Sequence, residues 1–136
     1  MGQQQLLLLV MGVIAASVAV VAGIIAFQEK MRQSEMENLI NRNLEIANSA
    51  VYWKAKMDPY NGGNAKYMGL EENGLKKLFM DAETHHAKYE ITSATNNNLV
   101  ISGNSLRYTD IGARTYITNY TIDSTIVSFN SEIIVE

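Results

Sequence analysis

The feature that most constrains this chain is an apolar segment near its start, LLLLVMGVIAASVAVVAGIIAF, which covers residues 6–27 without one charged side chain. At 1.5 Å per residue, a helix of this length is roughly 33 Å long, enough to cross the hydrocarbon core of a bilayer. Its apolar residues surround the helix, whereas an amphipathic helix of a soluble protein has one polar face. We therefore expect burial in lipid or among other helices.

A cleavable secretory signal is the alternative interpretation of such a segment. It needs a basic start, an apolar run of about 7–15 residues and a small-residue cleavage site. No Lys or Arg precedes Leu6, and the apolar run is too long, so a retained helix is favoured. Lys30 and Arg32 follow the segment, and the positive-inside rule alone would keep the remainder in the cytoplasm. A basic leader lost by processing would remove this conflict.

The helical pattern continues beyond the apolar segment. Residues 28–57 contain no Gly or Pro and carry an i, i+3, i+4, i+7 stripe: Met36, Leu39, Ile40, Asn43, Ala47, Ala50, Val51 and Lys54. Charged residues off the stripe are Glu29, Lys30, Arg32, Glu35, Glu37, Arg42 and Glu45. We predict one helix of about 50 residues that ends near Asp58-Pro59. The charged half has too few heptad repeats for a coiled-coil dimer, so the stripe is expected to pack on the chain's own head.

Residues 58–136 predict a small head of turns and strands. Turn dipeptides at Asn61-Gly62-Gly63-Asn64 and Asn73-Gly74 precede a short helical piece at 74–80. Alternation around Tyr89 and Ile91, and again around Leu99 and Ile101, predicts a hairpin with its turn at 95–98. Strands are also predicted at 114–122 and 125–129, joined at Asp123-Ser124, with a short last strand at 132–136.

These elements predict an α+β fold, in which a long N-terminal α-helix with an apolar first half packs against a small antiparallel β-sheet head. The expected parts are the hydrophobic assembly or transmembrane helix at 1–27, its amphipathic continuation at 28–57, and the loop and β head at 58–136. The stripe, with Tyr52 and Trp53, is the apolar surface expected to cover one face of the sheet.

Composition and motifs give no support for catalysis or for a cofactor. The net charge is −3, the basic residues are scattered, and there is no cysteine, so we expect no nucleic-acid partner and no thiolate site. Nucleotide-binding and hydrolase motifs are absent from the sequence. We interpret His85-His86 as a surface loop and residues 58–64 as a turn rather than a calcium loop. Asp81, Glu83 and His85 alternate, a weak indication of metal that an ordinary solvated edge explains better. We therefore predict no enzyme and no metal site.

A lipid-length apolar helix that continues as an amphipathic helix under an antiparallel sheet resembles a type IV pilin. The resemblance covers the whole architecture, and its local motif lies in residues 1–27. In that family a leader is removed, the first residue is often Phe or Met, and the apolar helices form the filament core. Met1 fits the first position and Leu6–Phe27 fits the assembly segment. A second frame, with processing after Gly2 and Gln3 first, resembles archaeal pilin and flagellin leaders.

Two positions depart from that family's pattern. Gln5 stands where a glutamate is usual, and Ala22 stands where many members have proline. A neutral Gln5 cannot form the ion pair with a neighbouring α-amino group, but its amide can still accept a hydrogen bond. We interpret Gln3, Gln4 and Gln5 as polar contacts between subunits, the alternative being solvation among lipid headgroups. Gly12 and Gly23 are the expected points of helix flexibility or of close helix packing.

The resemblance implies a structural subunit of an extracellular filament on the cell surface, held in the inner or cytoplasmic membrane before assembly. The implied partners are identical subunits in a homopolymer, together with a leader peptidase, an assembly ATPase and a platform protein. The residues expected in the filament core are Met1, Gln3, Gln4, Gln5, Leu6, Leu7, Leu8, Leu9, Val10, Val13, Ile14, Val18, Val21, Ile24, Ile25 and Phe27. The alternative is a single-pass membrane-anchored accessory protein or a pseudopilin-type protein of a secretion system. Asn119-Tyr120-Thr121 is a glycosylation acceptor sequon.

Overall fold

The computed structural model describes residues 2–60 and 62–135 of the chain. Helix α1 covers Gly2–Ala55, which confirms the expected helix of about 50 residues. The chain divides within this helix into two compact units, residues 1–34 and residues 35–136.

The end of helix α1 is held by the loop that follows it. The backbone N–H of Gly63 donates to the carbonyl of Trp53 at 2.8 Å, and that of Ala65 donates to the carbonyl of Lys54 at 2.8 Å. These bonds satisfy carbonyl groups that have no partner inside the helix. The loop leads to a short 3₁₀ helix at Met68–Leu70 and to helix α2 at Gly74–Lys77, in the region where a short helical piece is predicted.

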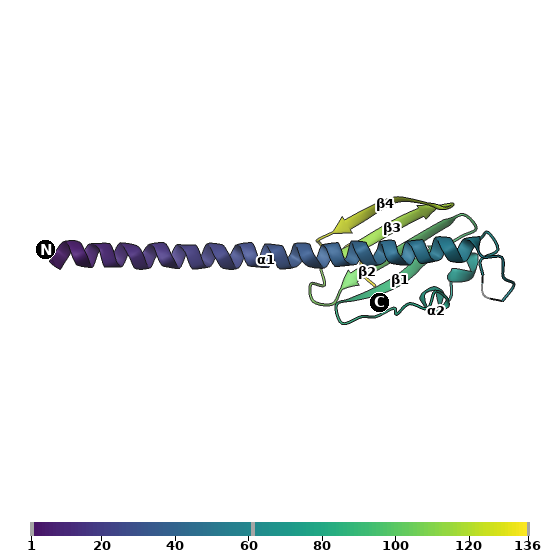
Figure 1. The fold of residues 1–136 in the computed structure, drawn as a ribbon, viewed down its shortest axis with the longest axis horizontal. Helices are drawn as coiled ribbons and strands as arrows, with labels where there is room; N and C mark the ends of the chain where they lie inside the picture. The colour runs from purple at the N-terminus through teal and green to yellow at the C-terminus, as the bar shows by residue number, and fades with distance from the viewer. Residues whose placement is uncertain (1, 61, 136) are drawn as a thin grey trace. The chain divides into compact units, whose positions relative to one another are not determined.

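The second unit contains one antiparallel sheet of four strands, in the order β1-β2-β3-β4. The strands are β1 (Ala87–Ala94), β2 (Asn98–Ser105), β3 (Gly112–Thr118) and β4 (Thr121–Ser128). Figure 1 shows the helix, from residue 35 onward, lying along one face of this sheet. The α+β arrangement expected from the sequence is therefore confirmed, as is the hairpin formed by β1 and β2.

Two strand predictions are wrong. The turn between β3 and β4 lies at Asn119-Tyr120 and not at Asp123-Ser124, because Asn119 adopts a left-handed backbone (φ 56°) that asparagine tolerates. Asp123 instead forms a bulge, since Ile117 pairs with Ile122 and Tyr116 pairs with Ser124. A second bulge interrupts β1 between Ile91 and Ser93.

The short last strand is also not formed over the described residues 132–135. Ser131 has a positive φ of 62°, which breaks the extended conformation before this segment. The amide of Asn104 donates to the carbonyl of Ile133 at 3.2 Å, so a side chain and not a strand ladder holds the segment. Glu136, the final residue of the predicted strand, lies outside the described residues.

The core lies between the helix and the sheet. Leu39, Ala47 and Ala50 from the predicted stripe are buried there, which confirms the stripe as the face that packs on the head. Other buried apolar residues are Ile46, Trp53, Tyr67, Leu70, Leu75, Ala87, Tyr89, Ile91, Ala94, Leu99, Ile101, Ile111, Ala113 and Ile117. Asn43 crosses this layer, where its amide donates to the carbonyl of Ala113 at 3.2 Å.

Two side chains of the helix differ from expectation. Tyr52, predicted to join the core beside Trp53, is 73% exposed, because neighbouring helix positions point about 100° apart and Trp53 takes the inward direction. Glu35, predicted to lie off the stripe, is buried at 6% exposure. The hydroxyl of Ser105, at the end of β2, donates to its carboxylate at 3.3 Å and supplies a polar partner inside the head.

Candidate membrane and assembly segment

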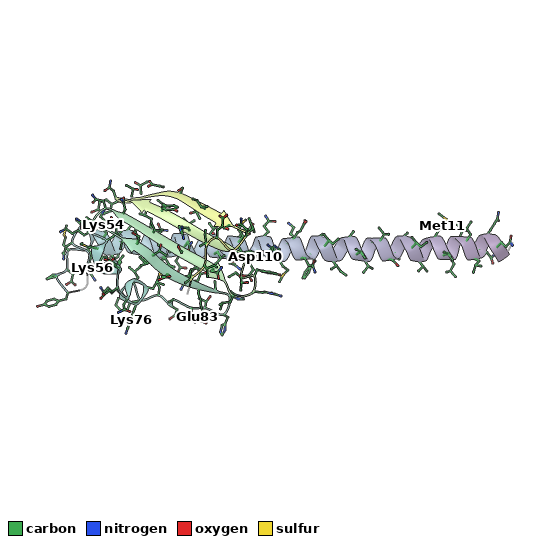
Figure 2. The ribbon with its side chains drawn as sticks, turned by 180° about the vertical axis from the view of Figure 1, so that it is seen from behind. Met11, Lys54, Lys56, Lys76, Glu83 and Asp110 are labelled. Atoms are coloured by element: carbon green, nitrogen blue, oxygen red, sulfur yellow. The ribbon has the colours of Figure 1, made fainter. Side chains whose placement is uncertain are left out.

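Residues 2–34 form a helix whose apolar side chains have no tertiary partner within their own unit. The large side chains from Leu6 to Phe27 are each about half to two-thirds exposed, Leu6 at 63% and Phe27 at 64%. Figure 2 shows side chains projecting from all sides of this part of the helix, Met11 among them. The apolar surface therefore extends around the whole circumference.

This segment is long and apolar enough to cross a membrane. Among the described residues, α1 alone meets that test, and none of its most apolar window is buried. Monomeric soluble proteins rarely expose contiguous apolar patches larger than a few hundred Å². The long apolar N-terminal helix is thus compatible with a transmembrane helix and indicates membrane association.

The polar and small residues of the segment leave this surface uninterrupted. The hydroxyl of Ser17 donates to the carbonyl of Val13 at 2.8 Å, so its hydrogen bond is satisfied within the helix even in an apolar environment. A Cβ added at Gly12 or Gly23 would meet nothing within 4 Å, and the helix continues through both. These two positions are therefore open places where another helix can approach closely.

The glutamines lie in the first turns of the same helix. Gln3, Gln4 and Gln5 are all exposed, and successive residues step 100° around the axis, so their amides point in different directions. Met1 lies outside the described residues. The structure thus places the predicted assembly residues from Gln3 to Phe27 on one helix, while their contacts with other subunits stay a prediction.

The head carries a buried ammonium group near the end of α1. Lys54 is 2% exposed, and its Nζ lies 4.6 Å from the ring centroid of Tyr67 and 4.5 Å from that of Tyr120. Burial lowers the pKa of Lys54 from its ordinary value. The pKa of Tyr67 is raised to about 12 by burial and, to a lesser degree, by Tyr120. Lys54 belongs to the predicted stripe, but no pattern in the sequence indicated the two rings that enclose it.

Asn119 lies at the turn between β3 and β4 and is exposed. Its backbone carbonyl accepts a hydrogen bond from the hydroxyl of Tyr67. A sequon at an exposed turn is sterically accessible for modification, and glycosylation of Asn119 stays a prediction.

The residues considered as metal ligands do not gather into a site. Among residues 2–60 and 62–135, no group of three or more His, Asp or Glu side chains is placed to hold a metal ion. Glu83 forms an isolated β-bridge with Lys88. His85 and His86 are exposed on the loop before β1, as expected, and His86 Nδ1 lies 4.0 Å from the carboxylate of Glu35.

Comparisons of the chain with protein-family models, with characterised proteins and with solved structures find no match. The long N-terminal helix with a small antiparallel sheet is compatible in shape with a pilin-like fold.

Proposed function

We propose that this chain is a structural subunit of a type IV pilus-like filament, assembled through burial of its N-terminal helix. The observation that carries the proposal is the apolar surface of residues 6–27, which surrounds the helix and meets no partner in its own unit. Such a surface is stable in lipid as a stored monomer, and it is equally stable among identical helices in a filament core. The role is structural and requires no catalytic group.

The arrangement of polar groups supports assembly beyond simple anchoring. Three consecutive amides stand at the start of the apolar segment, where lateral hydrogen bonds to neighbouring subunits would be sheltered from water. Because the apolar surface surrounds the helix, one side of each helix can pack against a different side of the next, and such head-to-tail contacts can propagate without closing and produce a fibre. The membrane is the site of the stored subunit, and the cell surface is the site of the filament. Its partners are identical subunits and, by resemblance, a leader peptidase, an assembly ATPase and a platform protein.

The second candidate is a single-pass membrane-anchored accessory protein or a pseudopilin-type protein of a secretion system. Gln5, in place of the acid usual in type IV pilins, favours it, because the ion pair between subunits is then missing. Shearing of the source cells, electron microscopy of the released material and mass spectrometry of the subunit separate the two. The first proposal expects thin filaments that contain this chain with its apolar helix intact. Recovery of the chain as a membrane-bound monomer alone would favour the anchored protein.

A charge placed in the apolar segment tests the burial mechanism. We expect Ala15→Glu or Val18→Asp to abolish filaments, because a carboxylate at the centre of a membrane helix costs about 2.5 to 3.5 kcal/mol. Val18→Leu and Lys66→Ala are the matched controls, and both should assemble normally. Filaments of normal yield from Val18→Asp would contradict the proposal.

The glutamines separate assembly from anchoring. Replacement of Gln3, Gln4 and Gln5 by alanine leaves the apolar segment intact, so the chain should still enter the membrane fraction. We expect the filament yield to fall, because the lateral amide contacts are lost. Unchanged filament yield would assign the three side chains to the lipid headgroup region.

A further inference from the structure

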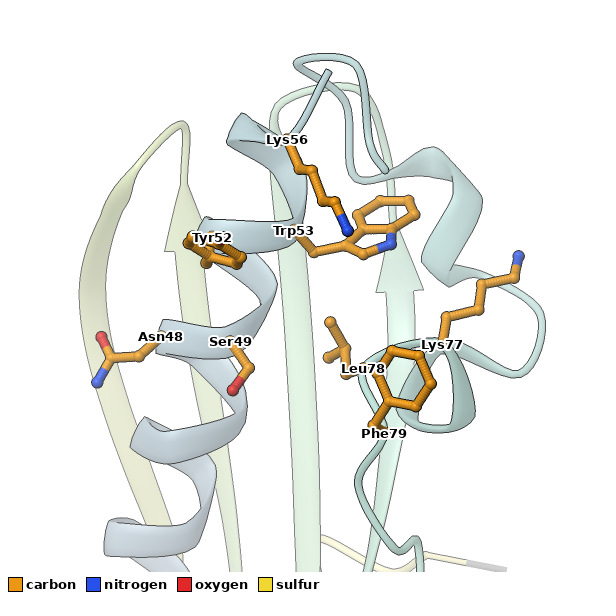
Figure 3. Close-up of a pocket in the computed structure, with 8 residues that line it drawn as sticks. All are labelled: Asn48, Ser49, Tyr52, Trp53, Lys56, Lys77, Leu78 and Phe79. Carbon is orange, nitrogen blue, oxygen red and sulfur yellow. The ribbon is translucent and has the colours of Figure 1, made fainter. Parts of the chain in front are cut away.

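The head contains an open pocket at the end of α1 that the filament proposal does not use. It has a volume of about 380 Å³ and is lined by Asn48, Ser49, Tyr52, Trp53, Lys56, Lys77, Leu78 and Phe79. Its size lies within the range of small-molecule sites. Figure 3 shows Ser49 and Trp53 of α1 on the side of the helix that faces Leu78 and Phe79. Two segments that are far apart in the sequence thus form its opposite walls.

Phe79 gives the first sign that this pocket has a function. It follows helix α2 with a positive φ of 58°, and the N–H of Met80 donates to the carbonyl of Leu75 at 2.9 Å. In this kind of helix ending the left-handed residue is usually glycine, because a side chain there is unfavourable. Phe79 is nevertheless 85% exposed, so the ring gains little burial in return. The fold therefore keeps an aromatic ring at the rim of the pocket at a cost in stability.

The polar groups of the pocket are mostly donors. Lys56 brings an ammonium group to the pocket, whereas Figure 3 shows the ammonium of Lys77 pointing away from the other lining side chains, and it donates to the carbonyl of Gly69. Among the described lining residues there is no Asp or Glu. The electrostatics therefore favour an anionic ligand, and a carboxylate fits an ammonium donor by a charge-assisted hydrogen bond.

The remaining lining residues define the rest of the ligand. The exposed rings of Tyr52 and Phe79 offer flat apolar faces, and Figure 3 shows the two on opposite sides of the pocket. Asn48 and Ser49 add an amide and a hydroxyl, which can both donate to and accept from hydroxyl groups. A ring with one apolar face, several hydroxyls and a carboxylate matches this combination.

We propose that this pocket binds an acidic sugar unit, such as a hexuronate, with its ring against the exposed aromatic residues and its carboxylate at Lys56. The proposal is independent of filament assembly, because every lining residue belongs to the second unit of the chain. A membrane-anchored head would carry the same site.

Trp53 allows a direct measurement of binding, because it is the only tryptophan in the chain. Full-length protein in detergent micelles is titrated with glucuronate, with glucose and with acetate while the tryptophan fluorescence is recorded. We expect a saturable change with glucuronate at about 1 mM or below, and at least tenfold weaker responses to the other two. No saturable response to glucuronate up to about 50 mM would overturn the proposal. So would an equal response to glucose, which lacks the carboxylate, or to acetate, which lacks the ring.

Substitutions at the pocket provide the second test. We expect Lys56→Gln to weaken glucuronate binding by about tenfold, because one charge-assisted bond is lost. Lys76→Ala is the charge-matched control, since Lys76 is exposed on the same short helix as Lys77 but does not line the pocket. If both lysine substitutions weakened glucuronate binding equally, the effect would come from net charge, and the proposed site would be wrong.

Phe79→Gly separates a ligand-binding role from a structural one. Glycine adopts the left-handed backbone conformation without the steric cost of a side chain, so the melting temperature of the head should rise by a few degrees. Binding of glucuronate should weaken by at least fivefold in the same variant, because one stacking face is lost. If the variant bound glucuronate as tightly as the parent chain, Phe79 would not be part of the binding site.

Discussion

The ammonium of Lys54 is buried in the head beside two aromatic rings. The ammonium of Lys54 lies against the rings of Tyr67 and Tyr120, and this contact joins the end of α1 to the turn between β3 and β4. The hydroxyl of Tyr67 adds a hydrogen bond to the carbonyl of Asn119 in the same turn. Aromatic faces attract a desolvated cation by on the order of 2 kcal/mol, which opposes the cost of burying it.

The raised pKa of Tyr67 gives the head an alkaline limit of stability. Tyr67 ionises near pH 10 in the unfolded chain and near pH 12 in the folded one, so the unfolded state holds fewer protons between these values. Its contribution to the free energy of unfolding is fully present below pH 10 and is lost as the pH rises through 12. The loss is on the order of 2 to 3 kcal/mol. The lowered pKa of Lys54 has the opposite effect on stability. Lys54 releases its proton at a lower pH in the folded chain than in the unfolded one, so its contribution to the free energy of unfolding increases as the pH rises.

Tyr67→Phe isolates this effect, since it keeps the ring beside Lys54 and removes the ionisable hydroxyl. Unfolding of the full-length chain in detergent is measured between pH 8 and pH 12 for both proteins. At pH 8 the free energy of unfolding of the variant should be lower by about 0.5 to 1.5 kcal/mol, because the hydrogen bond to the carbonyl of Asn119 is lost. It should also lose less stability than the parent chain above pH 10. If both proteins lost the same amount of stability above pH 10, the effect would come from groups other than Tyr67.

At the scale of elements, the packing of α1 on the sheet depends on a close approach at Gly103 in β2. A Cβ at this position would lie 2.8 Å from the ring of Tyr89 and 3.1 Å from Oδ1 of Asn43. The Asn43 side chain is the one that crosses the core to the carbonyl of Ala113. The absence of a side chain at Gly103 therefore lets helix and sheet approach each other.

Gly103→Ala is expected to destabilise the head by about 1 to 3 kcal/mol, because overpacking displaces a ring and an amide together. Urea unfolding of the full-length protein in detergent measures the change. Gly23→Ala is the control, since an added Cβ there meets nothing within 4 Å and the position lies in the other unit. A Gly103→Ala variant as stable as the parent chain would show that the contact relaxes freely.

The elements were predictable where a local pattern decides them. The apolar run and the stripe on residues 36–54 indicated the helix and its inward face, and the alternation in residues 89–101 indicated the first hairpin. The turn at Asn119-Tyr120 was missed because it lacks glycine, while Asp123-Ser124 looks like a turn and is accommodated as a bulge. Glu35 was misplaced because its partner, Ser105, is 70 residues away in the chain.

The pocket at Trp53 could not be predicted for the same reason. Its two walls come from residues 48–56 and 77–79, and only the folded loop between them brings the lysines and rings together. The sequence did mark Tyr52 and Trp53 as neighbouring aromatic residues, but it could not tell which of them points outward. The positive φ of Phe79 has no signal in the sequence, because glycine is the residue expected there.

At the scale of the whole molecule, all buried core residues among those the structure describes lie at positions 35–60 and 62–135. Every buried residue of the helix, from Glu35 to Lys54, lies in the second unit, whereas the apolar side chains before residue 28 are exposed. The two units therefore have different requirements: the first needs lipid or other helices, and the second holds its own core.

A chain that begins at Glu35 should consequently fold without the apolar segment. We expect it to be soluble without detergent, to show the circular dichroism of mixed α-helix and β-sheet, and to unfold cooperatively. Its melting temperature should lie within about 5 °C of that of the head in the full-length protein, a difference of about 1 kcal/mol. A fragment without a cooperative transition would show that residues before 35 contribute to the stability of the head.

The bulges in β1 and β4 have a consequence for chains that are crowded together. These are the two edge strands of the sheet, and a flat edge with free backbone groups is a template for pairing with another chain. Each edge is twisted by its bulge, at 91–93 in β1 and at Asp123 in β4. The segment before β1 also covers part of that edge, where the N–H of Tyr89 donates to the carbonyl of Ala82. Both features lower the tendency of the sheet edges to pair with another chain when heads lie close together.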